Sequence, residues 1–314
     1  MAPGSKRRCE SSRFRRTAQS ASRISYGLAA LLLYAAGTAG ASEHTVSVGG
    51  RHRTYSVFRP ESLGRRHPVP LVVVLHGGFG NGAQAERAYR WDDTATTKGF
   101  VVAYPNGLRR SWNAGGTCCG PAYKNEVDDV AFLDAMIRAI SSRENIDPRR
   151  IYLTGISNGA AMAYRYACDG KVTIAAIGSV AGTMPASCAK LRPVSVMEIH
   201  GLKDENIPFD GGVGRKGVTH IDWPPVQATL SRFRRADHCG PVSTRKTGAV
   251  ERSDALCADG RAVSLITIAG AGHQWPGSVA ARPIAQRLLQ LDPPSTALDA
   301  TATLWAFFEA HPAP

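Results

Sequence analysis

The stretch "RRIYLTGISNGAAMAYRYAC" (Arg149–Cys168) holds one serine between two glycines, where a run of β-formers gives way to an alanine-rich segment. Residues 149–155 predict a buried strand and residues 158–170 predict a helix, so Ser157 falls in the turn between them. Residues 155–159 match G-x-S-x-G, a spacing typical of a sharp strand-to-helix turn whose neighbours must be small. Such a turn is either purely structural or lifts a nucleophilic hydroxyl out of the sheet, and its position between two predicted elements favours the nucleophile.

Strands and helices alternate on both sides of this turn. The predicted strands cover 44–60 (a hairpin), 70–78, 99–107, 173–182, 194–201 and 262–270, and further helices cover 128–145, 224–238 and 295–312. Alternation of this kind predicts an α/β fold with a mostly parallel sheet and helices on both faces. A chain of 314 residues can bury one large core, so we expect a single domain.

The N-terminus has the pattern of a secretory signal peptide. Seven Lys and Arg residues precede the apolar run 24–40, and "AGA" at Ala39–Ala41 is a small-x-small cleavage pattern. We predict a signal peptide over 1–41 and a mature α/β domain over 42–314, secreted to the extracellular space or periplasm, with no stable membrane insertion after cleavage. An N-terminal membrane anchor is the alternative. Cleavage would lower the formal net charge from +13 to about +7.

The remaining basic residues are scattered and form no stripe with aromatic residues, which argues against a nucleic-acid partner. The six cysteines beyond the signal are Cys118, Cys119, Cys168, Cys188, Cys239 and Cys257. An even number in an exported protein predicts disulfides, and six cysteines allow fifteen connectivities. Short loops favour Cys168 with Cys188, and Cys239 with Cys257, which leaves Cys118 and Cys119 as an adjacent pair or paired elsewhere. None has zinc spacing with histidine, so the cysteines predict no zinc site. No cofactor is expected.

A nucleophilic serine needs a base, and polar groups at strand ends are the candidates. His273 follows the last predicted strand in "GAGHQWPG", where glycines would let a loop aim the ring. His76 and His200 also follow strands, but each precedes a glycine, a position more typical of a histidine that orients a loop.

The base needs a carboxylate that orients it. Asp204 lies just past the strand 194–201, and Glu205 and Asp210 are its rivals. With Ser157 and His273, Asp204 gives the chain order serine, acid, histidine that is expected of α/β-hydrolases.

An oxyanion formed at the serine needs backbone donors. The N–H of Asn158 follows the nucleophile at a helix N-terminus, and a second donor is expected from Gly78 or Phe79 in "HGGFGNG". Trp275 lies two residues after His273, and Trp112 lies in the predicted loop "SWNAGG". Each could either contact substrate or pack inside the protein.

Two further acidic residues lie at the start of a predicted helix. Asp128 and Asp129 precede or open the helix 128–145 and are expected to cap it rather than to take part in chemistry.

These motifs together resemble the secreted polyhydroxybutyrate depolymerase-like esterases and the feruloyl esterases related to carbohydrate esterase family 1. The similar segments are "VVVLHGG", "GFVVAYPNG", "SWNAGGTCCGPA", "VDDVAFL", "RRIYLTGISNGAAMAYRYAC", "IHGLKDENIPF" and "GAGHQWPG", in the same order from about residue 44 to 310. The resemblance implies an α/β-hydrolase fold in one domain, no metal, and Ser157, Asp204 and His273 as nucleophile, acid and base.

The sequence therefore predicts a secreted serine esterase that cleaves carboxylic esters through an acyl-enzyme. The expected substrate is a polyester oligomer of the 3-hydroxyalkanoate type. The first alternative is a feruloyl or acetyl esterase that acts on esterified plant polysaccharide. Further alternatives are a peptidase and a non-catalytic cell-surface binding protein on a hydrolase frame.

Overall fold

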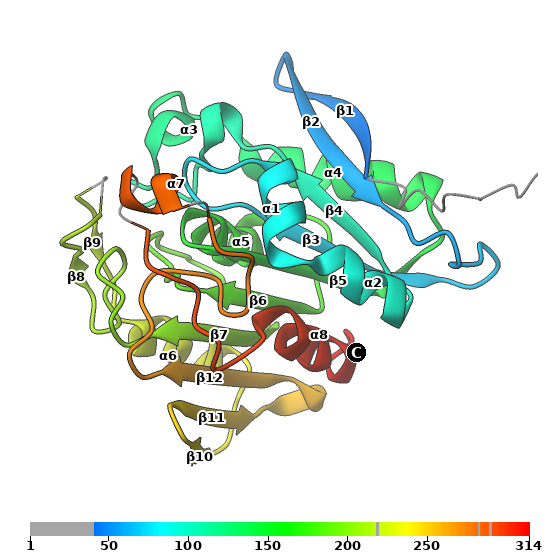
Figure 1. Cartoon of the computed structure of the whole chain (residues 1–314). Coiled ribbons are helices and arrows are strands. Elements are labelled where there is room, and N and C mark those ends of the chain that lie inside the picture. Colours follow the sequence, from blue (N-terminus) through cyan, green and yellow to red (C-terminus); the bar gives the residue numbers. More distant parts are fainter. Residues whose placement is uncertain (1–40, 218–219, 282, 289–290) are drawn as a thin grey trace, which may run out of the picture. The chain divides into compact units, whose positions relative to one another are not determined.

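The computed structural model describes residues 41–217, 220–281, 283–288 and 291–314 (Figure 1). These residues belong to one compact unit. The predicted signal peptide, 1–41, lies outside the described residues except for Ala41. Within the described ranges, no helix combines the length and the apolar character needed to cross a bilayer.

A ten-stranded sheet runs in the order β1-β2-β4-β3-β5-β6-β7-β12-β11-β10. Neighbours from β4 to β12 pair in parallel, and antiparallel strands extend the sheet on both sides. The bounds are β1 Ser42–Val48, β2 Arg51–Phe58, β3 Val69–Leu75, β4 Val101–Pro105, β5 Ile146–Ile156, β6 Ala176–Val180, β7 Ser195–Gly201, β10 Val242–Thr247, β11 Val250–Leu256 and β12 Ala262–Ile268. A separate antiparallel pair joins β8 (Gly212–Val213) to β9 (Asp222–Trp223). The predicted α/β fold with a mostly parallel sheet is confirmed.

The central strand β3 explains why helices cover both faces. All seven of its residues are buried, and successive side chains point to opposite faces of a sheet. Leu71, Val73 and Leu75 join one apolar cluster, whereas Val72 and Val74 join another. Burial of each such side chain stabilises the folded protein by roughly 1.5–3 kcal/mol. Both faces of the sheet must therefore be packed against other elements.

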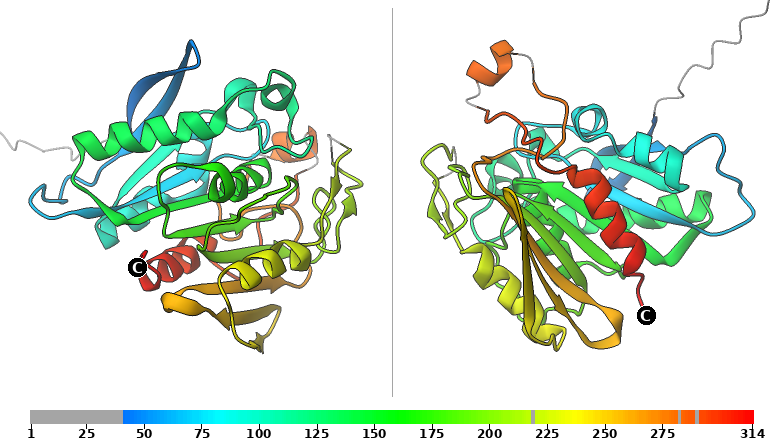
Figure 2. Two further views of the ribbon diagram at one scale, coloured as in Figure 1. Left: turned by 180° about the vertical axis from the view of Figure 1, so that it is seen from behind. Right: turned by 60° about the horizontal axis from the view of Figure 1, so that its bottom comes forward.

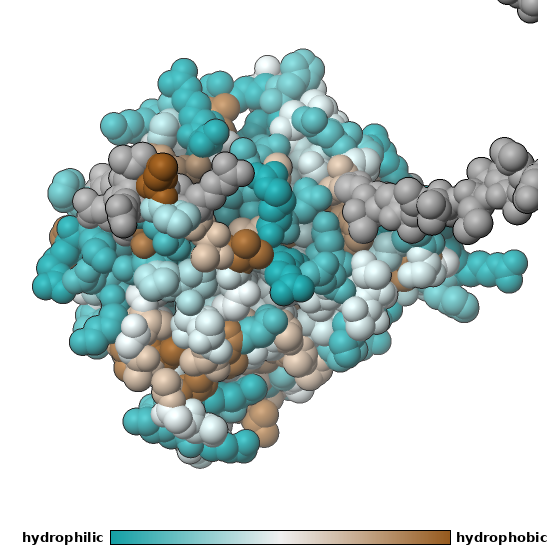
Figure 3. All heavy atoms as spheres, in the orientation of Figure 1, coloured by the Kyte–Doolittle hydropathy of each residue, from teal (hydrophilic) through white to brown (hydrophobic). Residues whose placement is uncertain are grey.

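Two groups of helices supply that cover (Figure 2). The first cluster includes residues of α4 (Asp129–Arg143), α5 (Asn158–Asp169) and α6 (Val226–Ala236), which lie in front of the sheet in the view from behind. The second includes residues of α1 (Gly82–Tyr89), α2 (Trp91–Lys98) and α8 (Ala300–Ala310). The shorter elements are α3 (Gly120–Lys124), α7 (Pro283–Leu288) and two 3-10 turns, Leu108–Arg110 and Ala258–Gly260. On the face drawn in Figure 3, apolar side chains are scattered among hydrophilic ones.

Three disulfides join the six cysteines of the described chain. Cys168 pairs with Cys188, and Cys239 pairs with Cys257, as their short separations predicted. Cys118 pairs with its neighbour Cys119, which decides between the two alternatives for these residues. The sequence also predicted that Asp128 caps a helix, and its carboxylate accepts the N–H of Ala131 in the first turn of α4.

Candidate active site

Ser157 stands in the turn between β5 and α5, as predicted. Its backbone has φ 58° and ψ −122°, a conformation that L-residues rarely adopt, and its N–H donates to the Val180 carbonyl at 3.0 Å. A Cβ at Gly155 would lie 2.8 Å from the Leu75 oxygen, and one at Gly159 would lie 2.5 Å from the same oxygen. The two glycines are therefore required by the close approach of α5 to β3, which places the serine at the N-terminus of a helix.

Asp204 and His273 form a hydrogen-bonded pair. Asp204 lies just after β7, and its Oδ2 accepts His273 Nδ1–H at 2.7 Å. The other oxygen, Oδ1, accepts the backbone N–H groups of Asn206 and Ile207, each at 2.8 Å. Because Asp204 can only accept, Nδ1 carries the proton, and in the neutral imidazole Nε2 is left as the basic nitrogen.

The environment of Asp204 favours its ionised form. Burial acts to raise the pKa of this carboxyl, but the charge and hydrogen bond of His273, the charge of His200 and the Ile207 N–H outweigh burial. The pKa of Asp204 is therefore lower than usual. An ionised carboxylate at this point holds the ring of His273 in one tautomer and favours its protonated form during a proton transfer.

The three candidate catalytic residues follow β5, β7 and β12, which run parallel to one another. In the sheet, β7 lies beside β12, and only β6 lies between β5 and β7. Carboxyl ends of parallel strands meet at one edge of the sheet. Ser157, Asp204 and His273 thus share the edge at which α/β enzymes place their chemistry.

His200 has a different role from that of a base. Its side chain is fully buried, with Nδ1 2.8 Å from Glu198 Oε1 and Nε2 2.9 Å from the Ile207 carbonyl. Since the carbonyl only accepts, Nε2 carries a proton. Burial lowers the pKa of His200, but the Glu198 and Asp204 carboxylates raise it above its ordinary value overall. The ring ties the loop that carries Asp204 to the strand beneath it.

His76 is likewise a loop-orienting residue, as expected from the glycine after it. Its Nδ1 lies 2.8 Å from the Gly77 carbonyl, and its Nε2 accepts the Gly107 N–H at 3.0 Å. Burial lowers the pKa of His76 to about 4, so the ring is neutral at physiological pH.

The rival acids are engaged elsewhere. Glu205 forms ion pairs with Arg215 and Lys216, and Asp210 lines a surface hollow near β8. Within the described residues, Asp204 is the one that hydrogen bonds to His273 Nδ1.

The backbone N–H groups predicted as oxyanion donors differ in whether another group of the protein already accepts them. Asn158 opens α5, and a first-turn N–H has no carbonyl partner within its helix. A Cβ at Gly77 would lie 3.7 Å from Ser157 Cβ, so the loop that holds Gly78 borders the serine. The Phe79 N–H, by contrast, donates to the Arg110 carbonyl at 2.9 Å and is occupied.

Phe79 brings a different feature to the site. Its side chain is 67% exposed, although large apolar side chains are usually buried. The ring therefore offers an apolar surface to solvent in the loop that follows β3. The sequence predicted a backbone role at this position and missed the exposed ring.

The structure buries both tryptophans that were considered as substrate contacts. Trp275 is 1% exposed, stacks on Tyr89 with ring centroids 4.5 Å apart, and donates to Thr301 Oγ1. Trp112 is 0% exposed and donates from Nε1 to the His76 carbonyl at 2.9 Å. Both rings pack inside the protein in this structure, which favours the packing alternative over substrate contact.

Two contributors to the site were not found from sequence. Asp292 Oδ2 accepts the backbone N–H of His273 at 2.8 Å, and Glu198 holds His200 and the Tyr164 hydroxyl. Asp292 lies in a loop far from any motif. Glu198 sits inside a β run, and a carboxylate in a buried strand is the signal that could have identified it. In the part of the chain that the structure describes, no three His, Cys, Asp or Glu side chains gather as a metal site.

Comparison with known proteins assigns the family. Residues 54–210 match the family described as "Esterase PHB depolymerase". The "Putative esterase NocK" of Nocardia uniformis subsp. tsuyamanensis is 30% identical over 74% of this chain and 73% of its own length. The "Probable feruloyl esterase C" of Aspergillus niger is 27% identical over 67% of this chain and 82% of its own.

Solved structures agree on the fold. The acetyl xylan esterase from Aspergillus awamori superposes with a TM-score of 0.55 at 16% identity, covering 79% of this chain and 99% of that one. At this identity the likeness concerns the α/β-hydrolase fold alone. The family match and the NocK relative together establish that this chain belongs to the PHB depolymerase family of esterases.

Proposed function

We propose that this esterase-family chain is a secreted serine esterase that cleaves carboxylic esters through an acyl-enzyme. The observation that carries the proposal is the hydrogen bond of 2.7 Å between Asp204 and His273, at the end of the sheet where Ser157 directly precedes α5. A serine, a histidine oriented by a carboxylate and a helix N-terminus are the parts that acyl transfer needs.

The reaction would start with attack of Ser157 Oγ on the ester carbonyl while His273 Nε2 takes the hydroxyl proton. The N–H groups of Asn158 and Gly78 would stabilise the oxyanion of the tetrahedral intermediate. As that intermediate collapses, the protonated ring gives its proton to the leaving alcohol. Water then attacks the acyl-enzyme with His273 as base, and the released acid restores Ser157.

Two substrate classes fit this mechanism. A 3-hydroxyalkanoate polyester oligomer is the first, in keeping with the family to which the chain belongs. A feruloyl or acetyl ester on plant polysaccharide is the second, and the name of the Aspergillus niger relative favours it. Hydroxybutyrate release and ferulate or acetate release from defined oligomers would separate the two.

Export is part of the proposal. The predicted signal peptide over 1–41 and the three disulfides both fit an oxidising compartment. N-terminal sequencing of the protein secreted by its host should read Ser42 or a residue close to it. A mature protein that retains Met1 would contradict this part.

The nucleophile is tested by Ser157→Ala, with Ser142→Ala as a control at an exposed serine of α4. We expect Ser157→Ala to abolish p-nitrophenyl acetate hydrolysis and fluorophosphonate labelling without a fall in Tm. His273→Ala should lower kcat by about 10⁶-fold. Retention of labelling in Ser157→Ala would refute the nucleophile, and failure of the wild type to label would favour a non-catalytic binding protein.

A further inference from the structure

Glu198 is a carboxylate within strand β7, and its side chain has no exposed surface. Its Oε1 accepts the Gly182 N–H at 3.2 Å and lies 2.8 Å from His200 Nδ1, and its Oε2 accepts the Tyr164 hydroxyl at 3.0 Å. A buried carboxylate stays ionised only where donors or a cation compensate its charge. Glu198 has such partners on both oxygens and is therefore a buried anion.

His200 carries a proton on each ring nitrogen. Its Nε2 lies 2.9 Å from the Ile207 carbonyl, which can only accept, and its Nδ1 faces the Glu198 carboxylate, which also only accepts. A histidine that donates from both nitrogens is an imidazolium. The pKa of His200 agrees: burial lowers it, but the hydrogen bond and charge of Glu198 and the charge of Asp204 raise it above its ordinary value.

This imidazolium lies beside the candidate catalytic acid. His200 Nε2 is 3.5 Å from Asp204 Oδ2, the same oxygen that accepts His273 Nδ1–H at 2.7 Å. A carboxylate beside an imidazole favours the protonated ring, and a nearby cation opposes protonation. His200 therefore offsets part of the effect that Asp204 has on His273.

The groups that face each ring define the charges that act on it. In the part of the chain that the structure describes, the carboxylates in contact with the His200 ring are those of Glu198, on its own strand, and Asp204. Two uncharged residues also adjoin it: Thr267 is its partner on β12, and the Phe209 ring packs edge-on, with ring centroids 5.8 Å apart.

His273 has charged neighbours of its own. Asp204 contacts its Nδ1, and Asp292, which forms an ion pair with Lys216, accepts its backbone N–H. None of these three residues is changed in the variants proposed below. A change in the pH dependence of the base would therefore report the charge on His200.

Glu198 also connects the acid loop to the helix of the candidate nucleophile. Tyr164 belongs to α5, which begins directly after Ser157. Gly182 lies against the first turn of the same helix, since a Cβ at this glycine would be 2.4 Å from the Ala160 Cβ. The carboxylate thus links the segments that carry the nucleophile and the acid.

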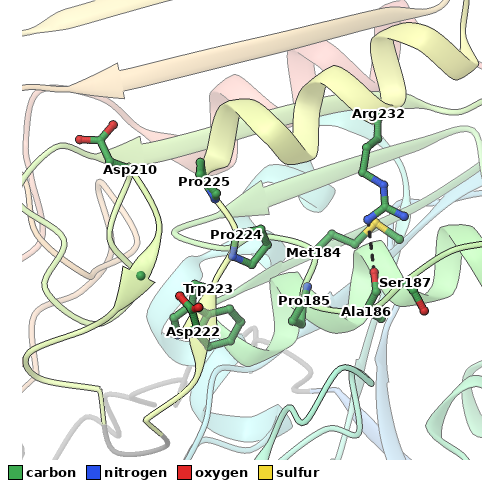
Figure 4. Close-up of a pocket in the computed structure, with 11 residues that line it drawn as sticks. Met184, Pro185, Ala186, Ser187, Asp210, Asp222, Trp223, Pro224, Pro225 and Arg232 are labelled. Atoms are coloured by element: carbon green, nitrogen blue, oxygen red, sulfur yellow. Dashed lines mark hydrogen bonds between the residues drawn. The ribbon is translucent and has the colours of Figure 1, made fainter.

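The Gly182 N–H has a fixed position because α6 anchors the residues that follow it. The Met184 N–H donates to Thr229 Oγ1 at 3.2 Å, and Arg232 donates to the Ala186 carbonyl at 3.3 Å. Figure 4 shows this second contact, where the guanidinium reaches from α6 to the segment after β6. The buried carboxylate therefore has a rigid donor, which keeps it in place against the imidazolium.

We propose that Glu198 and His200 form a buried ion pair that positions Asp204 and offsets part of its charge, which extends the activity of His273 as a base toward acidic pH. Both members of the pair act through Asp204 and are positioning residues. Without the imidazolium, the protonated form of His273, which cannot take the serine proton, would persist to higher pH. The proposal rests on the proposed esterase function and concerns the pH range of that same site.

The experiment measures kcat/KM for p-nitrophenyl acetate from about pH 4 to 9. In His200→Gln, which keeps a hydrogen-bond donor but no charge, we expect the acid limb of the profile to move up by about one pH unit. At pH 8, kcat should fall about tenfold at an unchanged KM, because the acid is less well positioned. Glu198→Gln should move the limb in the same direction but less far, because it removes an anion together with the proton that this anion holds on His200.

Two control variants separate charge from packing. Tyr164→Phe removes a hydrogen bond to the buried carboxylate but no charge, so its acid limb should coincide with that of the wild type. His67→Gln, at an exposed histidine, should keep the wild-type rate at every pH.

The results distinguish the ion pair from the esterase function. An acid limb of His200→Gln that coincides with that of the wild type overturns the proposal, and so does an equal shift in Tyr164→Phe. A wild type that hydrolyses no ester overturns the esterase function instead.

Nitrogen-15 NMR of the wild type tests the ion pair without a variant and without a substrate. At pH 8, where exposed imidazoles are neutral, the imidazole close to the Phe209 ring should retain protons on both nitrogens. An unprotonated nitrogen in that ring would overturn the proposal, even if neither variant of the pair folds.

Discussion

Replacement of Gly159 by alanine tests the close approach of α5 to β3 on which the serine turn depends. The added Cβ would lie 2.5 Å from the carbonyl oxygens of both Leu75 and His76, where ordinary contact begins at 3.4 Å. Both obstacles are backbone atoms, so no side chain can rotate away. The helix and the strand must instead separate by about 1 Å.

The change in the free energy of unfolding is the sum of two opposing effects. Overpacking of this kind costs about 1–3 kcal/mol, whereas alanine in place of glycine returns up to about 1 kcal/mol of helix propensity. The net loss of about 1–2 kcal/mol should lower Tm by about 2–4 °C in a domain of this size. Because the shift occurs next to Ser157 and the Gly77–Gly78 loop, kcat/KM should fall by about 10²-fold.

Thermal unfolding followed by circular dichroism and initial rates on p-nitrophenyl acetate would measure both effects. Gly64→Ala is the matched control, because no atom lies within 4 Å of the Cβ it would add and the residue is exposed. The control should keep the Tm and the rate of the wild type. A Gly159→Ala variant with unchanged Tm and unchanged kcat/KM would show that the glycine is not required by packing.

Three shorter predictions concern charge and burial. The pKa of Asp204 is lowered by folding, so this carboxylate contributes stability that is present above its unfolded pKa and is lost as pH falls through the folded value. In urea unfolding, the wild type should be more stable than Asp204→Asn by about 1–3 kcal/mol at pH 7. This difference should shrink below about pH 4. Burial raises the pKa of Asp92 to about 7 despite the hydrogen bond from Tyr104, so the folded state loses stability as pH rises from 4 to 7. Asp92→Asn should therefore have a free energy of unfolding about 1–2 kcal/mol above that of the wild type at pH 8, where partial exposure of the carboxyl limits the effect, and the same value at pH 4. Trp275→Phe loses the hydrogen bond to Thr301 and should lower Tm by a few degrees, about 1 kcal/mol, while a rise in KM would restore a substrate role.

The elements around the site could be predicted because their residues carry local signals. The run Leu71–Leu75 is apolar at every position, which a strand buried on both faces requires. The glycines at 155 and 159 indicated a tight turn because small residues are needed where backbones approach. These signals depend on nearest neighbours in the chain, and the structure confirms the elements they predicted.

The outermost strand of the sheet, β10, could not be predicted in the same way. All six residues of β10, Val242–Thr247, are exposed, so the strand has no apolar alternation to reveal it. It is held by antiparallel pairing with β11 and by the Cys239–Cys257 disulfide that closes the segment. The helices α1 and α2 were missed for a related reason, since their apolar positions are few and their cover of β3 is a tertiary contact.

The side chain of Asn158 shows why a motif locates a site better than it explains one. The motif accounts for its backbone N–H as an oxyanion donor, and any residue at that position has the same N–H. The structure adds a second role: Oδ1 accepts the Trp112 N–H at 2.7 Å, and Nδ2 donates to the Trp112 carbonyl at 2.9 Å. The Cys119 N–H also donates to that carbonyl, so the loop that contains Cys118 and Cys119 is fixed to the residue after the serine. The rigidity of the proposed oxyanion site therefore depends on Trp112, 46 residues earlier in the chain, a dependence that only long-range geometry reveals.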